Sequence, residues 1–214
     1  FNNEIFFLEF IKQAENSLTV LGYTEHGLKH AILVSDRARI LAKEIGLSDK
    51  EQELSAIAGI CHDMGNFLSR TNHHYLGALL FNQIFGNDFK PKDLAVIMQA
   101  ISNHDKDEMK FANPVSAILV LADKSDVRRS RVLLKDMNKI KADIHNRVNF
   151  ATNFSKLAVN KKNKTITLSL KIDTNFVPIM EYFEIFTERM TYCRKAAEYL
   201  GYKFCLVINN FKLL

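Results

Sequence analysis

The residues with the clearest chemical potential are His62 and Asp63, which stand side by side at the end of the apolar run Ala58–Cys61. An imidazole and a carboxylate in adjacent positions can both direct a lone pair at one divalent cation. The apolar residues before them would anchor a helix, and Gly65 would let the backbone turn away after it. A histidine beside a helix-capping aspartate is also common without a metal, so this interpretation depends on further ligands elsewhere in the chain.

Other histidines and aspartates that could bind the same ion are scattered along the chain, at positions expected near helix ends. They are His26, His30, His73, His74, His104, Asp105 and Asp123. Residues at helix ends can converge on a pocket inside a helical bundle, where such folds build metal sites. The scatter excludes a zinc finger. The mixture of histidines and carboxylates favours a hydrolytic Fe, Mn, Mg or Zn centre with open positions.

The order of these residues resembles the H…HD…D pattern of the HD-domain metal-dependent phosphohydrolases. The matching residues are His30, the pair His62 and Asp63, and finally Asp123. The resemblance covers about residues 20–130. It implies a helical bundle in which these four side chains hold a first metal ion, with His62 and Asp63 at the catalytic centre.

Two further histidines resemble ligands of family members that bind two metal ions. His73 lies four residues before Gly77, a spacing found in those members, and His104 matches their next ligand. In those members the aspartate of the adjacent pair bridges the ions, a role that would fall to Asp63. The resemblance therefore implies one or two divalent ions per chain. No GYP signature follows His104, which disfavours a cyclic-di-GMP phosphodiesterase of that subgroup.

Basic residues close behind Asp123 could bind the phosphate groups of a substrate. The candidates are Lys124, Arg128 and Arg131. The alternative is that this run is the solvated start of a charged helix. His26 lies four residues before His30 and can share a helix face with it, so we interpret it as facing the substrate.

Most of the chain is predicted to form the helices that position these residues. Apolar residues recur at helical spacing over residues 3–21, 28–45, 49–61, 73–85, 91–103 and 114–123. Gly46 ends the second helix, and Ser48 with Glu51 forms a capping box for the third. Residues 132–150 are predicted to form one last long helix.

The pattern changes after residue 150. Residues 153–160 and 165–172 alternate apolar and polar side chains and predict a hairpin, followed by a helix over 178–200 and a strand over 204–208. The predicted fold is therefore mainly α. An HD-type helical bundle occupies residues 1–150, and a small basic α+β domain of β-β-α-β order occupies residues 151–214.

Composition and charge narrow the setting. The three cysteines lie far apart without a CxxC pair, which favours a reduced, cytoplasmic protein. No stretch is long and apolar enough to span a membrane. The net charge is +5, and the surplus lies in residues 150–214, which contain 10 Lys or Arg against 5 Asp or Glu. This surplus indicates a solvated basic surface or an anionic partner.

Together these patterns predict a hydrolase that cleaves a phosphate ester of a nucleotide or small phosphorylated metabolite through a metal-activated water. The runner-up is a non-catalytic HD-like module that senses a nucleotide or associates with RNA through the basic C-terminal domain. A third alternative is that this domain forms a homodimer through an exposed strand edge. A small phosphorylated substrate is the favoured partner, nucleic acid is less favoured, and no membrane partner is expected.

Overall fold

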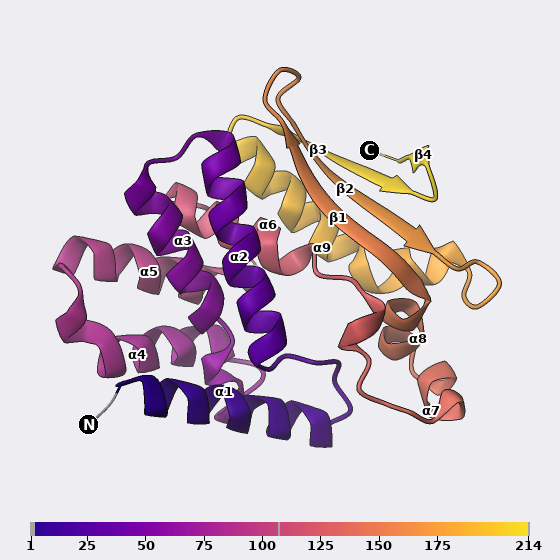
Figure 1. Ribbon diagram of the computed structural model, residues 1–214, viewed down its shortest axis with the longest axis horizontal. Helices are drawn as coiled ribbons and strands as arrows, with labels where there is room; N and C mark the ends of the chain where they lie inside the picture. Colours follow the sequence, from indigo (N-terminus) through magenta and orange to yellow (C-terminus); the bar gives the residue numbers. More distant parts are fainter. Residues whose placement is uncertain (1–2, 107, 214) are drawn as a thin grey trace.

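Helix α6 (Pro114–Lys124) lies at the centre of the fold in this computed structural model, which describes residues 3–106 and 108–213 (Figure 1). Every residue from Val115 to Lys124 is buried. A helix that is apolar all round must be covered on every side. The helices that pack around it are α2 (Leu28–Ile45), α3 (Asp49–Cys61), α5 (Pro91–Asn103) and α9 (Ile179–Tyr199).

The remaining N-terminal helices form an outer layer. Helix α1 (Asn3–Val20) packs along the short 3₁₀ helix η1 (Met64–Phe67). Helix α4 (His73–Phe85) packs against α5, and the 3₁₀ turn η2 (Gly86–Asp88) lies in the connection between them. The predicted helix ends are confirmed where local signals were strong. Gly46 has a φ of +91° and closes α2. The capping box also forms, since the Glu51 amide donates to Ser48 Oγ at 3.3 Å.

The single helix predicted over residues 132–150 is wrong. After the 3₁₀ turn η3 (Arg129–Arg131), the structure has two helices, α7 (Met137–Ala142) and α8 (Ile144–Ala151), separated at Asp143. Asp143 is extended, with φ −108° and ψ 126°, and its carboxylate accepts a hydrogen bond from the Asn146 amide at 2.8 Å. This cap starts a new helix, which apolar spacing alone could not reveal.

A four-stranded sheet follows α8 and is confirmed as the β-β-α-β unit, with one short extra strand at its end. The strands are β1 (Thr152–Asn160), β2 (Thr165–Ile172), β3 (Lys203–Ile208) and β4 (Phe211–Lys212), in the order β1-β2-β3-β4. The β1–β2 pair is an antiparallel hairpin, and β3 lies parallel to β2 because α9 crosses between them. Buried Ile166, Leu168 and Leu170 alternate along β2.

Helix α9 joins this sheet to the bundle. It packs against both α6 and β3 (Figure 1). Buried residues of α6 and α9 belong to one apolar cluster that continues into the strands, with Leu119, Phe186 and Leu206 among its members. The core is therefore continuous across residue 150, and the division into domains 1–150 and 151–214 stays a prediction.

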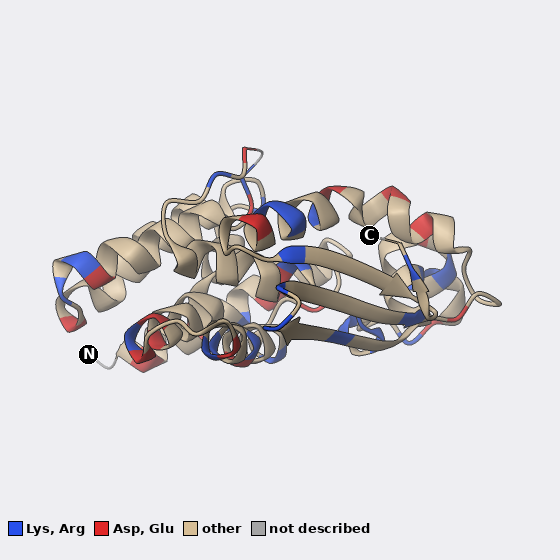
Figure 2. Cartoon of the chain, turned by 90° about the horizontal axis from the view of Figure 1, so that it is seen from above, with Lys and Arg blue, Asp and Glu red and all other residues tan. Residues whose placement is uncertain are grey.

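The strands and the turn between β1 and β2 carry the basic surplus of the C-terminal region. Lys156, Lys171, Lys203 and Lys212 lie on the strands, and the strand sequences contain no Asp or Glu (Figure 2). Both signs of charge are interspersed on the outer helices. No helix in the described part of the chain is long and apolar enough to cross a membrane.

Gly65 allows a close approach between η1 and the start of α4. Gly65 does not adopt the left-handed φ that is typical of a glycine at a helix end. A Cβ atom at this position would lie 2.2 Å from the His73 carbonyl oxygen and 2.6 Å from the Gly77 amide nitrogen. The missing side chain thus lets His73 approach the residues that follow α3.

Replacing Gly65 with alanine should therefore push η1 away from α4. We expect the free energy of unfolding to fall by about 1–3 kcal/mol, the usual cost of overpacking a tight contact. Urea denaturation followed by circular dichroism measures it. Gly86→Ala is the matched control, since its Cβ would meet only the flexible Asn82 side chain. Equal losses in both variants would contradict the role assigned to Gly65.

Candidate metal centre

Six side chains from five helices meet in one buried group, called here the His–Asp cluster. Its members are His30, His62, Asp63, His73, His104 and Asp123, all buried. His30 and His73 lie in the first turns of α2 and α4, and Asp123 lies in the last turn of α6. His62 and Asp63 follow the end of α3, and His104 follows the end of α5. The bundle therefore brings together the six ligands that the family resemblance implied. The other candidates, His26, His74 and Asp105, are not part of the cluster.

Asp63 lies between two pairs of histidines. Its Oδ2 is 3.4 Å from His62 Nε2 and 3.8 Å from His30 Nε2. Its Oδ1 is 3.4 Å from His73 Nε2 and 3.7 Å from His104 Nε2. One carboxylate thus presents a different oxygen to each pair, which is the arrangement that a bridging ligand requires.

Asp123 completes the group on one side of Asp63. Its Oδ1 lies 3.3 Å from His30 Nε2 and 3.7 Å from His62 Nε2. The ligand atoms form three sets of three, and within each set all atoms lie within 4.8 Å of one another. Together the three sets include all six residues. One set contains His30, His62 and Asp63, and another contains Asp63, His73 and His104.

Hydrogen bonds at Nδ1 orient the four imidazole rings. Each Nδ1 faces an oxygen that can only accept, so it carries a proton and leaves Nε2 as the ligand atom of the neutral ring. The acceptors are the carbonyl oxygens of Gly59, Arg70 and Ile101 for His62, His73 and His104 at 2.6–2.7 Å, and Asp126 Oδ2 for His30 at 2.8 Å.

The Nε2 atoms lack partners that would satisfy them. Those of His30 and His62 are buried without a hydrogen-bond partner in the described part of the chain. Those of His73 and His104 face each other at 3.1 Å, where two neutral rings would oppose lone pairs. Buried polar atoms are costly when unpaired, and a divalent cation is the partner that imidazole and carboxylate donors share. The donor set therefore fits a divalent metal ion.

The charges inside the cluster are strongly coupled. Burial would raise the pKa of Asp63, but His62 and the other histidines hold it well below its usual range. Burial would lower the pKa of His62, but Asp63 and Asp123 raise it to about 10. Burial lowers the pKa of His104 to about 4. Without a metal, a proton on His62 balances part of the carboxylate charge.

Asp126 is a residue whose role the sequence prediction missed. It is buried and accepts the Nδ1 proton of His30, so it fixes the orientation of that ring. Arg128 Nε donates to its carboxylate at 2.8 Å, and Arg131 Nη1 donates to its backbone oxygen at 3.0 Å. The sequence did contain a signal for this residue, because Asp126 lies three positions after Asp123 and is followed by arginines that could pair with it.

The predicted role of Arg131 in phosphate binding is wrong. Its side chain is buried, and Nε and Nη2 donate to the Glu25 carbonyl oxygen at 3.1 and 2.9 Å. Arg128 is similarly engaged, by Asp126 and by Glu25 Oε2 at 3.4 Å. Glu25 in turn accepts from the His30 amide at 3.1 Å. Both arginines thus support the loop and carboxylate that hold His30.

Lys124 lies at the edge of the cluster, in the position predicted for a substrate contact. Its Nζ is 3.0 Å from Asp123 Oδ2 and 2.5 Å from Asp105 Oδ1. Burial would lower its pKa, but these two carboxylates raise it, so the ammonium group is charged. Asp105 Oδ2 lies 3.7 Å from His73 Nε2. Direct contact between Lys124 and a substrate stays a prediction.

A pocket of about 450 Å³ opens beside the cluster, and it is called here the arginine pocket. His26 lines it, and the His26 ring lies 5.6 Å from the ring of His30 between centroids. The substrate-facing role of His26 stays a prediction that this position supports. The full lining is Leu21, Gly22, Tyr23, Thr24, His26, Arg70, Asp143, His145 and Arg189. Arg70 and Arg189 escaped the sequence prediction because neither adjoins a ligand in the chain.

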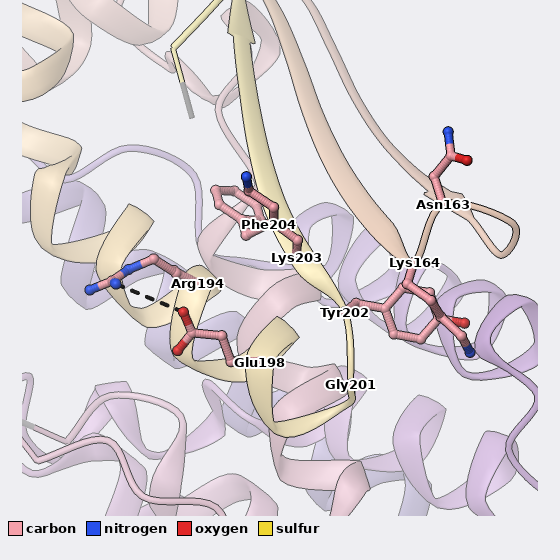
Figure 3. A pocket seen from close by; sticks show the side chains of 8 residues that line it. All are labelled: Asn163, Lys164, Arg194, Glu198, Gly201, Tyr202, Lys203 and Phe204. Atoms are coloured by element: carbon pink, nitrogen blue, oxygen red, sulfur yellow. Dashed lines mark ion pairs between the residues drawn. The ribbon is translucent and has the colours of Figure 1, made fainter.

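Two other hollows, like the arginine pocket, are lined by no residue of the His–Asp cluster. A larger one, of about 820 Å³, lies between the β1–β2 turn, the end of α9 and β3 (Figure 3). None of its lining residues belongs to the His–Asp cluster. His74, one of the candidate ligands named from the sequence, lines a third hollow with Tyr75 and Asp105.

Comparison with known proteins identifies the region that carries the cluster. The family model of the HD domain matches residues 27–137, slightly more than half of the chain. All six cluster residues fall inside this match. No curated protein matches the chain.

Metal binding should release a proton from His62. Because its pKa is about 10, His62 is protonated at pH 7 and must lose that proton before Nε2 can bind an ion. We expect affinity for Mn²⁺ to rise about tenfold per pH unit between pH 6 and 9. Titration calorimetry in buffers of different ionisation enthalpy measures the proton release. The control His74→Ala should leave it unchanged, and binding without proton release would contradict the charge balance described above.

Proposed function

Because this chain belongs to the HD-domain family of metal-dependent phosphohydrolases, we propose that it hydrolyses a phosphate ester of a nucleotide or another small phosphorylated metabolite. The observation that carries the proposal is the convergence of four imidazole Nε2 atoms on the two oxygens of Asp63. Once His62 has lost its proton, these buried nitrogens and the carboxylates beside them form a ligand set for a divalent cation.

In this proposal His30, His62, Asp63 and Asp123 hold a first ion. His73 and His104 would hold a second, and Asp63 would be a ligand shared by both. When bound, a divalent ion supplies a Lewis acid for a phosphoryl oxygen and lowers the pKa of a water ligand. The chain's own contribution is to fix the ligand geometry, because each imidazole is oriented by a hydrogen bond at Nδ1.

The residues around the cluster are suited to binding an anion. The Lys124 ammonium group lies between Asp123 and Asp105, close enough to offer a proton donor to a phosphoryl oxygen beside the cluster. Asp126 keeps the His30 ring in place through its buried hydrogen bond. Bulk water is limited at the ligand atoms, since even Asp123 is only 8% exposed. These features support phosphate chemistry.

Activity tests the proposal directly. Mn²⁺-loaded protein should hydrolyse members of a panel that contains p-nitrophenyl phosphate, bis-p-nitrophenyl phosphate and nucleoside mono- and diphosphates. His62→Ala and Asp63→Ala should each lower kcat/KM by about a thousandfold or more, since each removes a metal ligand. Cys205→Ala, which lies on β3 away from the cluster, is the control. A wild-type protein that binds metal but cleaves nothing in the panel would favour a non-catalytic nucleotide-binding module.

The second ion has its own test. His73→Ala removes a ligand on the Oδ1 side of Asp63, so elemental analysis should find about one ion fewer per chain than in the wild type. His74→Ala changes the neighbouring histidine, which lies outside the cluster, and should leave the metal content unaltered. A wild-type protein that holds a single ion at saturation would rule out the binuclear form.

A further inference from the structure

The arginine pocket is assembled from segments far apart in the sequence. Tyr23 and His26 come from the loop before α2, and Arg70 comes from the segment after η1. Asp143 and His145 come from the start of α8, and Arg189 comes from α9. This pocket lies between the HD-type bundle and the C-terminal elements, and its His26 ring lies 5.6 Å from the ring of His30.

Arg70 connects the pocket to the His–Asp cluster. Its Nη1 donates to Asn66 Oδ1 at 2.9 Å, and Asn66 Nδ2 donates to Asp63 Oδ1 at 2.8 Å. Its Nη2 lies 3.9 Å from Asp105 Oδ2. The guanidinium also lies over the ring of Tyr23, 5.6 Å from the ring centre. These contacts hold Arg70 in place, while its side chain stays 28% exposed and accessible from the pocket.

Arg189 approaches the pocket from α9 with its donors unused. Its guanidinium lies over the Phe186 ring at 5.0 Å and forms no hydrogen bond or ion pair within residues 3–106 and 108–213. Burial lowers the pKa of Arg189, and the carboxylates of Asp123 and Asp105 oppose that shift. A partly buried guanidinium with free donors favours an anionic partner that can fill them.

Within the described residues, the lining of the pocket offers no free carboxylate to Arg189. Asp143 is its one acidic lining residue, and its carboxylate is already occupied as the cap of α8. His26 donates its Nδ1 proton to the Thr24 carbonyl oxygen at 2.6 Å. The two arginines therefore dominate the pocket, whose volume suits a small anionic group rather than a polymer.

We propose that Arg70 and Arg189 bind a phosphate group of the substrate in the arginine pocket, so that helix α9 completes the site of the HD-type bundle. This proposal rests on the proposed function and gives residues 151–214 a part in substrate binding. Guanidinium groups recognise phosphate through paired N–H donors, and two of them can fix its orientation next to the cluster.

Phosphate binding tests the proposal. Inorganic phosphate is titrated calorimetrically into Mn²⁺-loaded wild-type protein and into Arg189→Met and Arg70→Met variants. Each variant should raise the Kd for phosphate by about tenfold, the usual effect of losing a charged hydrogen bond. The metal content by elemental analysis should stay unchanged. In steady-state assays the KM for a hydrolysed ester should rise more than kcat falls.

Arg194→Met is the matched control on the same helix. Arg194 lies five residues further along α9, faces a different side of the helix and pairs with Glu198 at 3.8 Å (Figure 3). The Arg194→Met variant should bind phosphate with a Kd within about twofold of the wild-type value. Arg189→Lys keeps the charge but not the fork of donors, so we expect an intermediate Kd, and it also serves if the methionine variant folds poorly.

The outcomes separate the two proposals. A wild-type protein that binds no phosphate, or an Arg189→Met variant that binds it as tightly as the wild type, overturns the assignment of the pocket. If such a variant still hydrolyses phosphate esters, the proposed function stands without it. If the variants lose phosphate binding but the wild type cleaves no ester, the pocket assignment stands and the proposed hydrolysis fails.

Discussion

The structure depends on collecting two carboxylates and four imidazole rings in a space that water barely reaches. Asp63 and Asp123 can stay ionised there only if positive charge lies beside them, supplied by the His62 proton, the Lys124 ammonium group or a metal ion. Burial of an uncompensated charge is among the most expensive events in folding. A divalent cation removes the conflict, because it binds carboxylates and the lone pairs of neutral imidazoles at once.

Helix ends supply the orientation that this arrangement needs. The last carbonyl groups of a helix lack partners within it. His62 and His104 each follow a helix and donate their Nδ1 protons back to the carbonyl three residues earlier, at Gly59 and Ile101. His73 uses the same spacing to Arg70. The backbone thus fixes the rings without a dedicated side chain, and only His30 depends on a carboxylate, that of Asp126.

The positive charges of the chain serve two separate purposes. Arg128 and Arg131 follow the ligand Asp123 closely in the sequence. Their guanidinium groups donate to Asp126 and Glu25 and therefore stabilise the structure around His30. Arg189 lies far away in the sequence, yet α9 packs on the central helix α6 and brings it to the pocket. Covering α6 and completing the pocket are therefore achieved by the same helix.

Local signals in the sequence were enough to predict most helices and the β-hairpin, because caps and apolar periodicity act within a few residues. The six cluster residues were suggested by the resemblance to the HD-domain pattern and not by such signals. Local signals failed at Asp143, where a cap divides one apolar pattern into two helices, and gave no indication of the contact with α4 that makes Gly65 important. Only the tertiary structure decided that Asp63 faces two histidine pairs and that Arg131 is buried. It also decided that Arg189 reaches the pocket, because such proximity arises from helix packing between distant segments, which leaves no local pattern in the chain.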